Sequence, residues 1–170
     1  MTWITFYYLT MSAAPATRST PQFRVEVDVE APVSRCFEAA YLESAMLRWV
    51  PRAADVTYDH SGAAEPYGPG AVRRIKVRPG LTLTEVVHAV ERPHLFAYRF
   101  GPDEFARRLV RDYQGWMSFE ERGPGSTRLT WAGHFDCRGW QKLIEPVMRA
   151  LLKKVVATLA REFASYCTEP

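Results

Sequence analysis

The stretch that decides the fold lies near the C-terminus and reads WQKLIEPVMRALLKKVVATLAREF over residues 140–163. Its apolar residues recur at i, i+3, i+4 and i+7, which predicts an amphipathic helix with one continuous apolar stripe. Pro146 marks its first proper turn or a kink, and the helix is expected to run on to Cys167. The stripe consists of Trp140, Leu143, Ile144, Val147, Met148, Leu151, Leu152, Val155, Val156, Leu159 and Phe163. Off it, on what we interpret as a solvated face, lie Arg149, Lys153, Lys154 and Arg161.

Upstream of this helix, β-strand patterns follow one another between turn signals. Residues 23–30 alternate apolar and charged side chains, which predicts a half-buried strand with Phe23 and three valines facing inward. Two short helices are expected next, the second over residues 42–49 and ending before Pro51. Six further strands are predicted at residues 56–58, 71–77, 81–91, 94–100, 112–121 and 126–137.

Together these patterns predict an α+β protein of the helix-grip type. A sheet with one apolar face has to bury that face, and the long helix provides the cover. We therefore expect a curved antiparallel seven-stranded sheet wrapped around the C-terminal helix, with two short helices after the first strand. A length of 170 residues suits one domain, placed at residues 22–167. Residues 1–21 are expected to form a flexible leader and residues 168–170 a short tail.

Composition narrows the classes of partner and cofactor. A formal net charge of only +3 gives no indication of nucleic-acid binding. The three cysteines are widely spaced and the four histidines stand singly, so neither a metal site nor another cofactor is expected. An odd number of cysteines favours a reducing, cytoplasmic location. The apolar residues 3–9 fall far short of the roughly 20 needed for a membrane span. Whether the chain forms a homodimer stays open.

A turn at residues 78–80 fixes which side chains face the helix. A three-residue loop with Gly80 in a left-handed conformation places Arg73 opposite Glu85 on the inner face. A two-residue loop would split the apolar residues between both faces, so the three-residue register is preferred. It also pairs Ile75 with Leu83 and Val77 with Leu81.

The remaining turns give the rest of the inner face. A two-residue connection at Arg92 and Pro93 places Phe96, Tyr98 and Phe100 inward. The last hairpin sets Gly115 opposite Gly133, which leaves either room for a ligand or a bend in the sheet. By the same parity Trp116 points outward, so either the register fails there or a partner covers the ring. The predicted ligand-binding residues are Phe96, Phe100, Tyr113, Gly115, Met117, Phe119, Trp131, Gly133, Phe135, Met148 and Leu152.

Arg73 and Glu85 are the charged members of this face. Charged groups are costly in an apolar interior unless they are paired. Inside a cavity the pair would orient a ligand carbonyl or phenol, and Glu85 would act as a general base, with Tyr98 as a second proton-transfer group. The alternative is an ion pair at the sheet margin that contributes under about 1 kcal/mol.

The order and spacing of several short motifs resemble the SRPBCC superfamily, in particular its polyketide cyclase/dehydrase-like branch. The resemblance covers roughly residues 23–166 and includes the long terminal helix. The motifs are VDVEAPV at residues 27–33 followed by Cys36 and Phe37, GPG at 68–70 before Arg73, ERP at 91–93 before a strand, and GSTRLTW at 125–131. This resemblance implies the helix-grip fold and a deep cavity between sheet and helix. It does not imply a single activity, because the superfamily includes cyclases, lipid and quinone carriers, hormone receptors and co-chaperone-like proteins.

Three functions are therefore compatible with the sequence. The first is a carrier or binding protein for a small hydrophobic molecule, aromatic, polyketide-like or lipid-like. The second is a cyclase or dehydratase that uses Arg73, Glu85 and Tyr98 on a polyketide-like substrate. The third is a protein-interaction module whose cavity is incidental.

Overall fold

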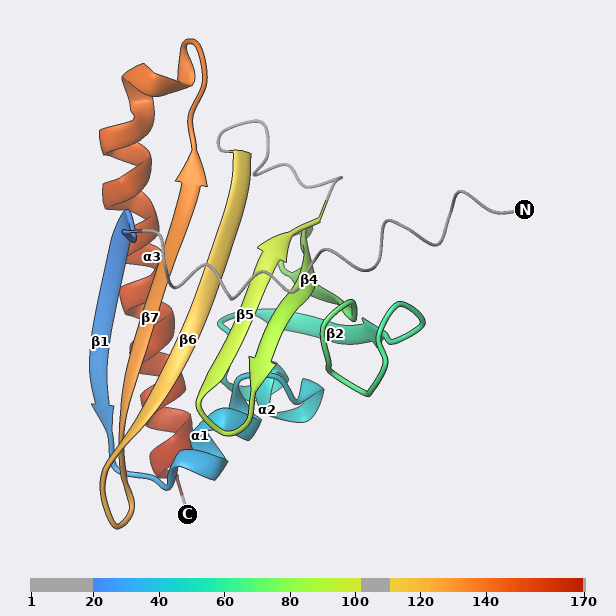
Figure 1. Cartoon of the computed structure of the whole chain (residues 1–170), viewed down its shortest axis with the longest axis vertical. Helices are drawn as coiled ribbons and strands as arrows, with labels where there is room; N and C mark the ends of the chain where they lie inside the picture. The colour runs from blue at the N-terminus through green and yellow to red at the C-terminus, as the bar shows by residue number, and fades with distance from the viewer. Residues whose placement is uncertain (1–19, 102–110, 170) are drawn as a thin grey trace.

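The computed structural model describes residues 20–101 and 111–169, and it has an antiparallel sheet packed against a long helix (Figure 1). The seven strands are ordered β1-β7-β6-β5-β4-β3-β2, which leaves β1 and β2 at the two edges. The predicted α+β helix-grip fold is confirmed. The strands are β1 (Phe23–Val29), β2 (Ala53–Asp59), β3 (Val72–Val77), β4 (Leu81–Glu91), β5 (Leu95–Phe100), β6 (Arg111–Gly123) and β7 (Ser126–Asp136).

Three helices complete the fold. The short α1 (Val33–Ala39) and α2 (Glu43–Trp49) follow β1 and lie near the C-terminal end of the long helix (Figure 1). That helix, α3 (Gln141–Thr168), extends for about 42 Å at 1.5 Å per residue and runs along the sheet. It begins before Pro146, which therefore lies inside the helix. Residues 1–19 of the predicted leader and residues 102–110 of the connection before β6 lie outside the described residues.

Two hairpins have the predicted register. In the β3–β4 hairpin Arg73 pairs with Glu85, and Gly80 has the expected left-handed φ of 128°. In the β6–β7 hairpin Gly115 pairs with Gly133. The parity argument therefore places the side chains of these four strands on the correct faces.

The β4–β5 connection differs from the prediction of two residues. Glu91 pairs with Leu95, so the connection has three residues. The register then shifts between Val87 and Ala89, and beyond this bulge Val87 pairs with Tyr98. A bulge inserts one extra residue into one strand, so it cancels the extra residue of the loop. For that reason Tyr98 still faces inward although the predicted loop length is wrong.

The apolar stripe predicted along α3 is not continuous on one face. Met148, Val156 and Phe163 are buried, whereas Leu143 and Val147 are exposed. Because a helix has 3.6 residues per turn, each step of four residues turns the side chain by about 40°. Apolar positions spaced four apart thus wrap around α3, while the sheet covers only one side of it.

Trp116 lies on the outer face, as the register predicts, yet its side chain is buried. On the neighbouring strands it pairs with Ala97 and Ala132, and these two alanines and Leu95 form an apolar cluster with it. Small alanine side chains on both sides leave room beside the indole ring. The register therefore holds at Trp116, and side chains of the same sheet pack against the ring, so neither of the two predicted alternatives is needed.

Candidate ligand-binding site

A cavity of about 270 Å³ lies between α3 and the inner face of the sheet. Small-ligand pockets typically range from about 300 to 1,000 Å³, so the space suits a small guest. The sheet contributes Arg73, Ile75, Leu81, Leu83, Glu85, Tyr98, Phe100, Tyr113, Met117 and Trp131 to its wall. The helices and the residues that end them contribute Ala40, Met46, Trp49, Val50, Met148, Leu152, Val155, Val156 and Leu159.

The wall includes part of the residue set predicted from the sequence. Arg73, Glu85 and Tyr98 all line the cavity. Of the predicted ligand-binding residues, those in the wall are Phe100, Tyr113, Met117, Trp131, Met148 and Leu152. Those outside the wall are Phe96, Gly115, Phe119, Gly133 and Phe135, of which the three phenylalanines are buried in the core.

The two facing glycines do not leave space for a ligand. A Cβ at Gly115 would lie 2.7 Å from Cζ of Tyr98 and 3.1 Å from the hydroxyl of Tyr113. A Cβ at Gly133 would meet the ring of Phe23. Aromatic rings thus occupy the room that the absent side chains leave, and the interpretation of this pair as ligand space is wrong.

Sequence reasoning missed the contribution of α2 to the cavity. Met46 and Trp49 line it, and the Trp49 ring packs edge-on against Trp131 at a centroid distance of 6.1 Å. A hydrogen bond from Trp49 Nε1 to the Ala39 carbonyl, 2.8 Å long, holds the indole in place. The spacing of Met46, Trp49 and Val50 is that of a helical apolar face, and this signal would have identified the wall.

Arg73 and Glu85 form a buried ion pair in the cavity wall. Their side chains are only 4% and 7% exposed. Arg73 Nε donates to Oε2 of Glu85 at 2.7 Å, and Nη2 lies 2.6 Å from the same oxygen. The alternative of a weak pair at the sheet margin is therefore wrong.

Arg73 also holds the two short helices against the sheet. Its Nη1 donates to the Ala40 carbonyl at the end of α1 (2.8 Å) and lies 3.4 Å from the Tyr58 hydroxyl of β2. Sδ of Met46 in α2 lies 3.2 Å from the same nitrogen. The guanidinium also lies over the Phe96 ring, 5.1 Å from its centroid. Partners from the protein itself thus surround this cation.

Burial and charge set the protonation states of the wall. Burial alone would lower the pKa of Arg73, but the Glu85 carboxylate, together with Tyr58 and Tyr98, outweighs it, so the pKa lies above its usual range and the cation persists. Burial raises the pKa of Tyr98 and of Tyr113, which stay neutral at physiological pH. The Tyr98 hydroxyl accepts a hydrogen bond from Trp131 Nε1 at 3.1 Å. The cavity therefore combines apolar walls, one internally neutralised ion pair and neutral hydroxyl groups.

The fold and the cavity define a helix-grip protein of the SRPBCC superfamily. A family model described as polyketide cyclase / dehydrase and lipid transport matches residues 20–168, so the chain belongs to this family. A comparison with curated proteins finds no match. Within the described residues, no helix combines the length and apolarity needed to cross a membrane.

Solved structures share the fold at low sequence identity. A truncated norcoclaurine synthase from Thalictrum flavum is 15% identical with a TM-score of 0.67, over 87% of this chain and 93% of that chain. Ara h 8.0201 is 14% identical with a TM-score of 0.65, over 85% and 95%. DynU16, from the dynemicin biosynthetic locus, is 20% identical with a TM-score of 0.62, over 85% of this chain and 46% of that chain. At such identities the similarity concerns the fold.

Proposed function

We propose that this protein binds a small hydrophobic molecule, aromatic, polyketide-like or lipid-like, in the cavity between the sheet and α3, and acts as a carrier or binding protein. The observation that carries the proposal is the cavity itself, enclosed by aliphatic and aromatic side chains from strands and helices. Apolar pockets with a few polar groups are typical of small-molecule sites. Membership of a family described by both cyclisation and lipid transport supports the same class of ligand.

The contacts of Arg73 favour binding over catalysis. An arginine that polarises a substrate carbonyl has to direct its N–H groups at the reacting oxygen. Here they are directed at Glu85, the Ala40 carbonyl and the Tyr58 hydroxyl. We therefore assign Arg73 a positioning role. Because the ion pair is already neutral, the ligand is inferred to be uncharged, with a hydroxyl group placed to meet Glu85 or Tyr98.

An enzyme of the cyclase or dehydratase type is the second candidate. Glu85 and Tyr98 lie in the wall of the same cavity, where a carboxylate and a phenol would serve as base and acid. A solved norcoclaurine synthase complex with dopamine and hydroxybenzaldehyde has a TM-score of 0.64 at 14% identity, over 84% of this chain and 83% of that chain. Proteins with this fold are thus compatible with chemistry on aromatic molecules.

Titration with the neutral fluorophore N-phenylnaphthylamine tests ligand binding. The wild-type chain is expected to bind it saturably, and Leu152→Trp, which places an indole in the cavity, should weaken binding by tenfold or more, about 1.4 kcal/mol. Leu151→Trp is the matched control, because the neighbouring Leu151 is 49% exposed and does not line the cavity. Equal binding by both variants would contradict the proposal.

Glu85→Gln separates the carrier from the enzyme. It keeps the shape of the side chain but removes the charge and the basic oxygen. A carrier should retain fluorophore binding in this variant. An enzyme should retain binding but no longer turn over a polyketide-like substrate. Turnover is measured as the rate at which product appears. Circular dichroism would confirm that the variant is folded.

A further inference from the structure

The N-terminal half of α3 exposes a row of large apolar side chains. Leu143 is 83% exposed and Val147 is 65% exposed. The row extends for about 22 Å along the helix. We call it the exposed stripe, and it consists of Trp140, Leu143, Val147, Leu151 and Val155.

An exposed row of this kind differs from scattered surface residues. Single exposed apolar side chains are ordinary, whereas contiguous patches mark surfaces that bind a partner or a membrane. Of the large apolar side chains described on α3, the exposed ones all precede Val156. The stripe is thus confined to one half of the helix.

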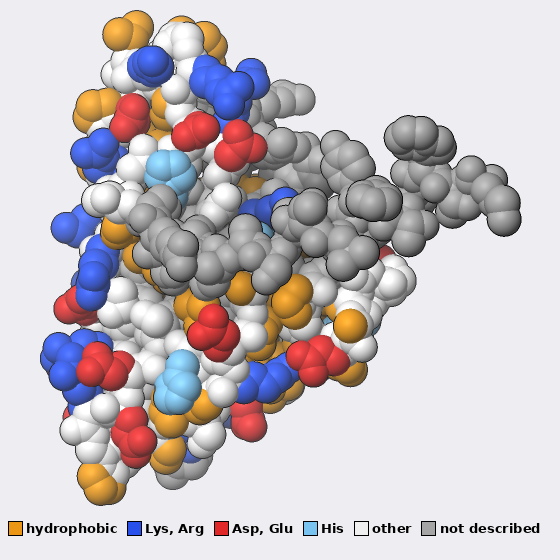
Figure 2. All heavy atoms as spheres, in the orientation of Figure 1, with side chains coloured by type: hydrophobic (Ala, Val, Ile, Leu, Met, Phe, Trp, Pro, Cys, Tyr) orange, Lys and Arg blue, Asp and Glu red, His pale blue; other side chains and the backbone are white. Residues whose placement is uncertain are grey.

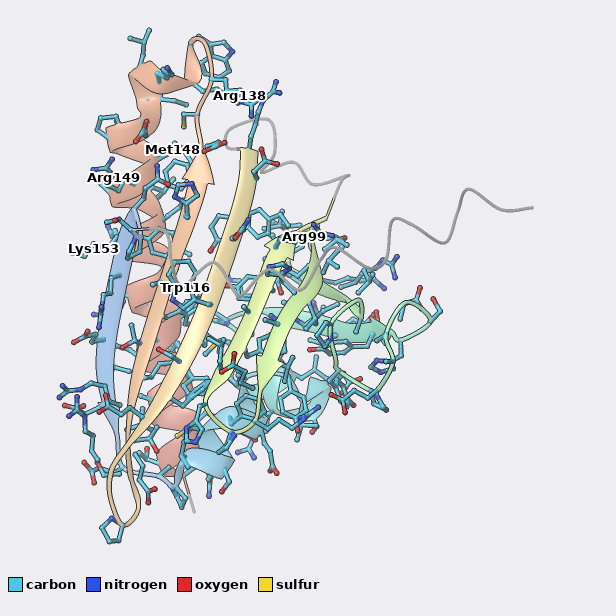
Figure 3. The ribbon with its side chains drawn as sticks, viewed as in Figure 1. Arg99, Trp116, Arg138, Met148, Arg149 and Lys153 are labelled. Atoms are coloured by element: carbon cyan, nitrogen blue, oxygen red, sulfur yellow. The ribbon has the colours of Figure 1, made fainter. Side chains whose placement is uncertain are left out.

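Basic side chains accompany the stripe. Residues 138–155 carry five basic side chains and one acidic one, Glu145. Glu145 forms an ion pair with Arg149, with 2.9 Å between Oε1 and Nη2. The Arg149 side chain is 52% exposed and Lys153 is exposed as well, and Figure 3 shows both on α3 near the start of β1. Figure 2 shows basic and hydrophobic side chains side by side over this part of the molecule. In contrast, residues 156–169 carry Arg161 against two glutamates.

This charge distribution indicates which kind of partner binds the stripe. A second copy packed antiparallel on the stripe would bring Lys142 of one chain close to Lys153 of the other, with a net positive charge on both sides. A surface of anionic lipids complements the same charges. An apolar helical face with Lys and Arg beside it and a tryptophan at its end is typical of helices that lie in the membrane interface.

We propose that the exposed stripe and the basic residues around it dock this protein onto an anionic lipid surface. The apolar side chains enter the boundary between headgroups and acyl chains. Lys153 and Lys154 reach the phosphates through their flexible stems. The helix lies on the surface and does not span the bilayer.

One residue of the stripe also lines the cavity. Val155 belongs both to the stripe and to the cavity wall. Leu81, at the start of β4, also lines the cavity and is 43% exposed. Docking would therefore place the rim of the cavity at the lipid surface. An apolar ligand could then pass between bilayer and cavity without crossing water. This consequence rests on the proposed function, whereas docking itself does not.

Vesicle flotation of the full chain tests the docking. Vesicles of phosphatidylcholine with phosphatidylglycerol should bind the protein, vesicles of phosphatidylcholine alone should bind it weakly, and added salt should release it. Leu143→Glu and Val147→Glu should each lower the partition by tenfold or more. Leu47→Glu is the matched control, because Leu47 on α2 is exposed to 43% and lies away from the stripe. All three sites are exposed, so the variants should fold.

A second pair of variants tests the charges. Lys153→Gln with Lys154→Gln should weaken binding to anionic vesicles severalfold, whereas Arg161→Gln should leave it unchanged. Absence of binding to anionic vesicles, or equal binding by Leu143→Glu and Leu47→Glu, would overturn the proposal. So would a dimer in analytical ultracentrifugation that Leu143→Glu dissolves, because the stripe would then bind a second copy. The Leu152→Trp chain should still bind vesicles even though its cavity is blocked, which separates docking from ligand binding.

Discussion

The apolar side chains in the two halves of α3 have different surroundings. In the C-terminal half, Phe163 packs against Trp49 at a ring distance of 5.3 Å and against Phe119 at 6.2 Å, so beyond the cavity-lining Leu159 the helix meets α2 and the sheet directly. In the N-terminal half, Leu152 borders the cavity and Leu143 is exposed. Both halves share one apolar periodicity. The difference teaches that periodicity specifies a helix, whereas its surroundings decide whether each apolar side chain meets core, cavity or solvent.

The largest expected effect comes from shortening a side chain in the close-packed half of α3. Phe163→Ala should lower the free energy of unfolding by about 3–5 kcal/mol, because it removes a fully buried ring. Leu152→Ala should cost less, about 2 kcal/mol, since this side chain already borders open space and loses fewer contacts. Urea denaturation of both variants measures the difference. Equal losses would mean that the two halves are packed alike.

Breaking the ion pair between Arg73 and Glu85 should lower the free energy of unfolding by about 3 kcal/mol. Arg73→Met leaves the buried Glu85 carboxylate without its cation and frees the Ala40 carbonyl. Replacing both members, Arg73→Met with Glu85→Leu, should recover most of the loss, because an apolar pair carries no desolvation penalty. Chemical denaturation of the single and double variants forms the cycle. A double variant less stable than Arg73→Met alone would argue against this explanation.

A smaller effect on stability is expected at Gly133, where the absence of a side chain leaves room for the Phe23 ring. Gly133→Ala should cost about 1–3 kcal/mol, because the new Cβ would meet the Phe23 ring and lie 2.9 Å from the Gln114 carbonyl oxygen. Thermal unfolding measures the loss. Combining it with Phe23→Leu should reduce the penalty. An unchanged or higher melting temperature for Gly133→Ala would show that space remains there after all.

The smallest effect is a sensitivity to alkali. Burial raises the pKa of Tyr98 and Tyr113 above the value of about 10 expected in the unfolded chain. Above that pH the unfolded chain releases phenolic protons that the folded chain retains, so stability falls as pH rises. Each such tyrosine adds a slope of up to about 1.4 kcal/mol per pH unit. Tyr98→Phe should flatten the decline in a series of urea titrations, and an identical slope in wild type and variant would contradict the assignment.

Much of the fold could be predicted because the hairpins allow few solutions. At residues 78–80 only one loop length keeps Ile75 and Leu83 on one face, and this fixed Arg73 opposite Glu85. The β4 bulge could not be predicted, because a loop of two residues and a loop of three with a bulge give Tyr98 the same face. The sequence pattern is identical in both cases.

The site was harder to predict than the fold. Tyr98, Trp131 and Leu152 reach the cavity wall as expected from the inner face of the sheet and the apolar stripe of α3. Facing glycines signal only that side chains are absent, and neighbouring rings from β1, β5 and β6 decide what fills the room. Leu143 is exposed because the sheet covers only one side of α3, and the spacing of the apolar residues does not show which side that is.

Xenon binding to crystals of the protein tests most directly whether helix and sheet face each other across open space. Xenon enters apolar cavities of this kind and scatters strongly. We predict a xenon site between Leu152 of α3 and Trp131 of β7 in the wild-type protein, and its loss in Leu152→Trp. Side chains filling that volume in the crystal, with no xenon between α3 and the sheet, would contradict the existence of a ligand chamber.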